Sequence, residues 1–240
     1  MKHQALTLLL AAALLPACTT SGSDGGSDGN VLVTIRIENI GTTFTEPSGE
    51  VTPVFAPGIW VLHQGGEPLF TAQMPDRGEG LEALAEDGDP ASLSMAAFED
   101  LARGTFTMPD GTYEDGAIEP GGSFSAELSV PPGARLSLAG MFVQSNDLFV
   151  GTPAAGIPLV DMDGALVATD LTASFDLWDA GTEVNEEPGF GPNQAPRQAG
   201  PNTGPDEGGV VRPVSDAGDG FNYPAVSDFL RITATLATDG

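Results

Sequence analysis

Short runs of alternating apolar and polar residues, separated by turn residues, restrict this chain to a mainly β fold. The clearest run is Val31–Ile40, which alternates at its centre and is rich in β-branched residues, so it predicts a strand with one buried face. Later runs recur at intervals typical of a sandwich. We therefore expect an antiparallel β-sandwich in which the first and last strands are neighbours. The other predicted strands are Gly58–His63, Gly122–Val130, Arg135–Gln144, Asp147–Gly151, Leu171–Trp178 and Phe229–Leu236.

One segment departs from the strand pattern and predicts a short inserted helical region. Between Gly80 and Arg103, leucine and alanine recur at spacings of three and four, as in a helical stripe. Pro90 divides this region into two short helices, with Ser92 or Ser94 as the cap of the second. We expect the apolar stripe to pack on the sheet.

A long Pro/Gly-rich loop is predicted between Val184 and Tyr223. It holds six prolines and many glycines, and it has little apolar periodicity. Loops of this length in compact domains are usually functional or disordered. One hypothesis is a long excursion folded over the acidic end of the domain and partly ordered by apolar residues; the alternative is a disordered insertion. The apolar residues in question are Phe190, Val210, Val211 and Phe221.

The N-terminus has the pattern of an export signal. Residues 1–17 combine a charged start, an apolar stretch and a small-residue close, which predicts a secretory signal peptide. Leu15-Pro16-Ala17-Cys18 resembles a bacterial lipobox, which predicts lipidation of Cys18 and anchoring to the membrane of the cell envelope, at the outer surface; an ordinary signal peptide and a secreted protein is the alternative. Residues 18–29 form a flexible tether and residues 30–240 the globular domain.

Charge and residue counts exclude several classes of function. Without residues 1–17, seven arginines face 34 acidic residues, a net charge of −27, so this acidic protein is not expected to bind nucleic acid. Cys18 is the only cysteine, so no intramolecular disulfide forms. His63 is the only histidine left, and we expect it at the surface or half-buried. This scarcity argues against zinc or copper sites and against a Ser-His-Asp hydrolase.

Two turns bring carboxylates to the ends of apolar runs and predict a metal site. The first carries Asp147, and in the second Asp179 and Glu183 flank a glycine that permits a tight curl. Carboxylates brought close together repel one another unless a proton or a cation lies between them, and calcium prefers six to eight oxygen ligands. The alternative is that these acids only accept backbone hydrogen bonds in their turns.

These two turns also resemble those of the spondin domain, an extracellular β-sandwich module of matrix adhesion proteins and of bacterial and archaeal lipoproteins. The resemblance covers residues 31–238 and implies one calcium ion bound by Asp147, Asp179 and Glu183. Leu148 stands where that family usually has tryptophan, and Glu183 stands where it usually has aspartate. Further ligands are expected from backbone carbonyls, water or another acid, with Glu46, Asp163 and Asp176 as candidates.

The resemblance implies a non-catalytic, calcium-binding adhesion module at the cell surface, whose partner is a surface protein, a polysaccharide or a matrix component. Two alternatives stay open: a carbohydrate-active enzyme with a carboxylate pair, and a purely structural acidic envelope lipoprotein. Aromatic residues in the strands favour a core role over a sugar-binding one. These residues are Phe142, Phe149, Phe175 and Trp178.

Overall fold

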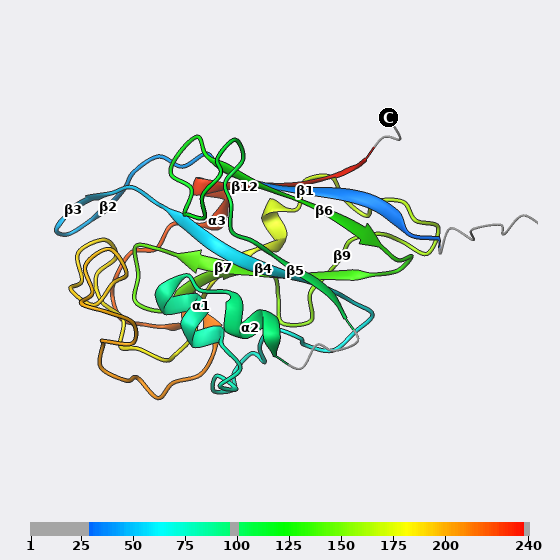
Figure 1. The fold of residues 1–240 in the computed structure, drawn as a ribbon. Coiled ribbons are helices and arrows are strands. Elements are labelled where there is room, and N and C mark those ends of the chain that lie inside the picture. Colours follow the sequence, from blue (N-terminus) through cyan, green and yellow to red (C-terminus); the bar gives the residue numbers. More distant parts are fainter. Residues whose placement is uncertain (1–28, 97–100, 238–240) are drawn as a thin grey trace, which may run out of the picture.

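The computed structural model describes residues 29–96 and 101–237 and is mainly β, with 34% strand against 11% helix. Its strands form antiparallel sheets in a β-sandwich arrangement, as predicted. In Figure 1 a small sheet lies above a large one, and the helices α1 and α2 lie below the large sheet. The predicted signal peptide, Cys18 and nearly all of the tether fall outside the described residues.

The small sheet joins the two ends of the domain. Its strand order is β12-β1-β6, and both pairings are antiparallel. Val33 lies opposite Leu236 and Asn39 opposite Leu230, so the expected pairing of the first and last strands is confirmed. The strands are β1 (Val31–Asn39), β6 (Ser123–Val130) and β12 (Leu230–Leu236).

The large sheet carries the remaining long strands and positions the acidic turns. Its order is β11-β10-β8-β7-β4-β5, with β9 also paired to β7. The strands are β4 (Phe55–His63), β5 (Ala102–Phe106), β7 (Arg135–Phe142), β8 (Leu148–Gly151), β9 (Ile157–Pro158), β10 (Asp176–Asp179) and β11 (Arg212–Pro213). A separate hairpin joins β2 (Phe44–Glu46) to β3 (Gly49–Val51).

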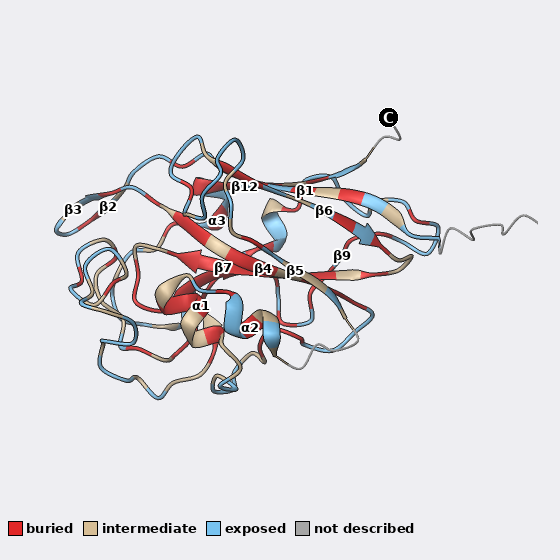
Figure 2. Ribbon diagram, in the orientation of Figure 1, coloured by how far each residue is buried: buried red, intermediate tan, exposed pale blue. Residues whose placement is uncertain are grey.

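Two apolar layers hold these elements together, and Figure 2 shows the buried residues along the facing strands. One layer lies between the sheets and includes Phe142 and Phe175. The other lies between the large sheet and the helices and includes Phe149, Trp178 and Leu84. All four aromatic residues predicted to be core are at most 5% exposed. Burial of such large side chains is the main stabilising term of a fold without disulfides.

The helical insertion has the predicted place but different details. Helix α1 covers Leu81–Asp87, and α2 covers Ala91–Met95. The expected cap by Ser92 or Ser94 is wrong: Pro90 occupies the N-cap, and the Asp89 Oδ1 atom accepts a hydrogen bond from the Ala91 amide at 2.8 Å. The predicted helical region, which ended at Arg103, also extended too far along the chain, because residues 102–106 form the edge strand β5.

The loop after β10 is an ordered excursion whose contacts tie it to the domain. Residues 184–223 contain β11, a 3-10 helix at Val214–Asp216, and the fully buried side chain of Val211. Helix α3 (Val226–Phe229) then leads into β12. Phe190 is 38% exposed, so of the apolar residues expected to order the loop, Val211 is the one that enters the core. None of the helices in the described ranges is long and apolar enough to span a bilayer.

Candidate metal centre

Strand pairing brings the two predicted acidic turns together. Asp147 precedes β8, and Asp179 is the last residue of β10. These strands are antiparallel neighbours in which Asp179 lies opposite Leu148. The Ala180 amide donates a hydrogen bond to the Asp147 carbonyl at 3.2 Å, which extends the pairing beyond the strand ends. Two carboxylates distant in sequence therefore meet at one end of the large sheet.

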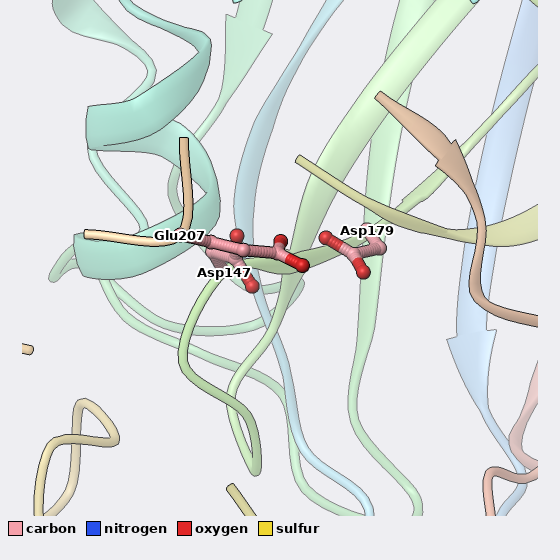
Figure 3. Close-up of side chains that lie close together, drawn as sticks. All are labelled: Asp147, Asp179 and Glu207. Carbon is pink, nitrogen blue, oxygen red and sulfur yellow. The ribbon is translucent and has the colours of Figure 1, made fainter. Parts of the chain in front are cut away.

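A third carboxylate comes from the long loop. The ligand atoms of Asp147, Asp179 and Glu207 all lie within 4.8 Å of one another, and Figure 3 shows the three side chains converging. The loop is held there by main-chain hydrogen bonds from the Glu207 amide to the Thr182 carbonyl and from the Gly209 amide to the Gly181 carbonyl, at 2.9 and 2.8 Å. Both aspartates are fully buried, whereas the Glu207 side chain is 24% exposed.

Gly181 makes this close approach of the loop possible. Its φ is +70°, a conformation that glycine adopts at little cost. A Cβ atom at this position would lie 2.6 Å from the Val210 nitrogen, so any side chain would push the loop away. The predicted tight curl at this glycine is therefore present, and it serves two purposes: it turns the chain and it admits the segment that carries Glu207.

Only one of the two carboxylate oxygens of Asp147 has hydrogen-bond donors among the described residues. Its Oδ2 atom accepts hydrogen bonds from the amides of Thr182 and Glu183, at 2.8 and 3.1 Å, and lies 3.2 Å from the Thr182 hydroxyl, whose single proton goes to the nearer Glu86 Oε1 atom at 2.7 Å. Its Oδ1 atom is buried and has no hydrogen-bond partner among the described residues. Burial and the nearby Asp179 raise the pKa of Asp147 to about 7, although the two amide hydrogen bonds oppose the rise.

One arginine compensates part of the charge. Arg212 donates to the Asp179 Oδ2 atom from Nε and Nη2, at 3.1 and 2.9 Å, and from Nη2 to the Glu207 Oε1 atom at 2.7 Å. Asp179 also accepts from the Gly181 amide through Oδ1, at 2.7 Å. With all groups ionised, three carboxylates and one guanidinium leave two negative charges.

The chemistry of the group suits a hard divalent cation. The Glu207 Oε2 atom, like the Asp147 Oδ1 atom, is buried and has no hydrogen-bond partner among the described residues. Buried carboxylate oxygens without donors are costly, and a calcium ion would satisfy them with the oxygen ligands that it prefers. The two excess negative charges of the carboxylates and Arg212 would also balance the two positive charges of the calcium ion.

Glu183, the third ligand implied by the resemblance, has a different place. It is buried, but its Oε1 atom accepts from the Gly204 amide at 2.7 Å and its Oε2 atom from the Asn146 side chain at 3.2 Å. These contacts hold its carboxylate at the base of the long loop. The group of mutually close ligand atoms includes Glu207 and not Glu183.

The other acids named from the sequence lie outside this group. Asp163 and Asp176 are exposed, and Glu46 is buried beside Asn222, whose amide donates to it at 3.4 Å. No periodicity marks Glu207, which the sequence analysis missed. The sole local signal is an acidic pair followed by two glycines at residues 206–209.

The expectation for His63 is wrong. It is 3% exposed, and its ring nitrogens lie 2.9 Å from the Ser137 hydroxyl and from the Gly65 carbonyl. Burial lowers the pKa of His63. The residue is thus the buried last residue of β4, and its ring is hydrogen-bonded to Ser137 of the neighbouring strand β7.

No family model and no curated protein matches this chain.

Proposed function

We propose that this protein is a non-catalytic, calcium-binding adhesion module of the cell surface. The observation that carries the proposal is the group of Asp147, Asp179 and Glu207, which holds two buried carboxylate oxygens without hydrogen-bond partners in the part of the chain that the structure describes. One calcium ion would be bound there. The remaining positions of its coordination shell would be filled by water or backbone carbonyls, since calcium takes six to eight oxygens.

The ion's role would be structural. The three carboxylates come from the turn before β8, from the end of β10 and from the long loop, so one ion would link three segments. Linking them would fix the loop end of the sandwich, where residues 184–223 offer a large surface. Binding residues are often placed on loops that a rigid scaffold positions.

Adhesion follows from the resemblance of the two acidic turns to the spondin domain. The proposal includes export, lipidation at Cys18 and anchoring at the outer surface of the cell envelope. The partner would be a surface protein, a polysaccharide or a matrix component. Calcium would act by holding the loops in their binding conformation, and loss of calcium would weaken binding.

Burial argues against the enzymatic alternative. A carboxylate pair in a glycosidase must reach both faces of a glycosidic bond, but Asp147 and Asp179 are fully buried. Trp178 is 5% exposed and packs against Phe70, with ring centroids 4.8 Å apart. It therefore offers no sugar-stacking face. The structural alternative, an acidic lipoprotein without a specific ion, differs from our proposal in its response to calcium.

Thermal unfolding with calcium and with chelator tests the proposal. We expect calcium to raise the melting temperature of the wild-type protein, because a ligand bound only by the native state stabilises it. Asp147→Asn and Asp179→Asn should abolish the shift, whereas Asp163→Asn, an exposed acid in a turn, should keep it. A wild-type melting temperature indifferent to calcium would refute the site. Calcium-dependent retention of the protein on surface or matrix material would then test adhesion.

A further inference from the structure

Two clefts meet at Tyr223, the last residue of the long loop. The larger cleft has a volume of about 490 Å³ and lies between residues 172–177, residues 213–215 and the start of α3. The smaller cleft, of about 370 Å³, lies between residues 42–45 and the end of α3, the helix that leads into β12 in Figure 1. Tyr223 and Pro224 line both clefts and so form the wall between them. Both volumes fall in the range of small-ligand sites.

The larger cleft combines buried apolar side chains with exposed polar ones. Leu177 and Val226 line it and are 5% and 4% exposed. Asp176, Ser215 and Ser227 also line it and are exposed. A ligand in this cleft would therefore meet an apolar floor and a border of hydroxyl and carboxylate groups.

The smaller cleft has the same make-up. Phe229 is fully buried and Phe44 is half-buried, whereas Thr42, Thr43 and Thr45 are exposed. A hydroxyl group both donates and accepts hydrogen bonds, and sugar hydroxyls have the same double capacity. Hydroxyl groups around an aromatic surface therefore match a sugar ring, which has hydroxyls at its edge and apolar C–H groups on its faces.

Tyr223 is fixed in its place between the clefts. Its hydroxyl donates a hydrogen bond to the Asp219 Oδ2 atom at 2.5 Å, and the Asp219 Oδ1 atom accepts from the Phe221 amide at 3.0 Å. The ring is half-buried, so part of its surface is left for a ligand. A held tyrosine ring offers a large contact area at a low cost in conformational entropy.

Charge restricts the class of ligand. Neither cleft has a basic lining residue, and each has one acid, Asp176 in the larger cleft and Asp228 in the smaller. The whole chain is strongly negative, so an anionic polysaccharide would be repelled. A carboxylate accepts several hydrogen bonds and can bind neighbouring sugar hydroxyls. Two similar clefts on either side of one ring fit a chain of similar units.

We propose that the two clefts bind a neutral polysaccharide that crosses Tyr223. The Tyr223 ring lies against a sugar ring, and the exposed hydroxyls and acids of both clefts bond to sugar hydroxyls. This inference rests on the proposed function, because it chooses the polysaccharide among the partners named there. Its failure would leave the calcium site untouched.

Isothermal titration in physiological salt and saturating calcium tests the proposal with neutral hexasaccharides. The probes are cellohexaose, mannohexaose and isomaltohexaose, and the hyaluronan hexasaccharide is the anionic control. We expect saturable binding of at least one neutral probe and none of the hyaluronan probe. Calcium titration of the same sample separates the two proposals: calcium binding without sugar binding overturns this one alone.

The variants locate the site. Tyr223→Ala should weaken the bound hexasaccharide about tenfold or more, the loss expected for an aromatic residue at the centre of an interface. Tyr223→Phe keeps the ring and should keep most of the affinity. Tyr113→Ala is the matched control, because Tyr113 is 96% exposed and lines neither cleft, and it should change nothing.

A second variant tests the larger cleft without removing a held side chain. Ser227→Trp places a large ring at an exposed position on the border of this cleft and should weaken binding about tenfold or more in a folded protein. The proposal is overturned by an absence of saturable binding of all neutral probes, or by tighter binding of the hyaluronan probe. Wild-type affinity in folded Tyr223→Ala or Ser227→Trp protein would overturn it as well.

Discussion

Removing the ionisable proton at Glu86 should change how the stability of the protein depends on pH. Burial raises the pKa of Glu86 from 4.5 to about 8, with the nearby Glu183 and Glu82 adding to the rise. The folded state therefore holds a proton that the unfolded state has already lost between these pH values. Stability from this group is fully present below pH 4.5 and is lost as the pH rises through about 8.

The size of the effect follows from the shift. One pKa unit corresponds to about 1.4 kcal/mol, so Glu86 should make the folded state about 3–5 kcal/mol less stable at pH 9 than at pH 4.5, relative to a residue that does not titrate. Glu86→Gln provides that reference, since glutamine keeps the shape and the acceptor for Thr182. Asp147, whose pKa is also raised, is present in both proteins, but its charge adds to the rise at Glu86, so the comparison measures the two interacting groups together.

Urea unfolding of both proteins in chelator, from pH 5 to pH 9, measures this difference. We expect the wild-type protein to lose stability relative to Glu86→Gln as the pH rises, and the two curves to separate mostly above pH 6. A difference between the two proteins that stays constant over this range would refute the reasoning. So would a wild-type protein that gains stability relative to the variant at high pH.

Two further substitutions test the contacts around the metal centre. Gly181→Ala should cost more than about 2 kcal/mol of unfolding free energy, because it adds the strain of a positive φ and a clash with the Val210 backbone. Gly208→Ala shares the positive φ but meets no atom within 4 Å, so a smaller loss of about 1 kcal/mol is expected, and equal losses in urea unfolding would contradict this explanation. Arg212→Gln should lower stability in chelator by about 1–3 kcal/mol, because two carboxylates lose their countercharge, and should strengthen calcium binding. An Arg212→Gln protein that is more stable than wild type in chelator, or that binds calcium more weakly in titrations, would contradict that role.

The strands were the most predictable part of the fold. The alternation in Val31–Ile40 predicts a strand, and the structure ends this strand one residue earlier, at Asn39. Burial on one face leaves a period of two in the sequence, which is why such strands are recognisable. Edge strand β5 was missed because residues 102–106 have a single buried position, Phe106, and so carry no such period.

The metal centre was predictable only in part. Asp147 precedes the apolar strand β8 and Asp179 ends β10, and their meeting follows from the antiparallel pairing of these two strands. Glu207 lies 28 residues beyond Asp179 in a loop without periodicity. No local pattern in the sequence therefore predicts that it lies near Asp179. Its place depends on hydrogen bonds to Gly181 and Thr182 that form only in the folded chain.

Direct calcium titration of the purified protein tests the central claim. We predict one ion per chain in the wild-type protein and in Asp163→Asn, and no measurable binding in Asp147→Asn. Glu207→Gln should weaken binding more than Glu183→Gln, because Glu207 shares the group with the two aspartates. A wild-type protein that binds no calcium, or an Asp147→Asn protein that binds one ion with unchanged affinity, would contradict the account.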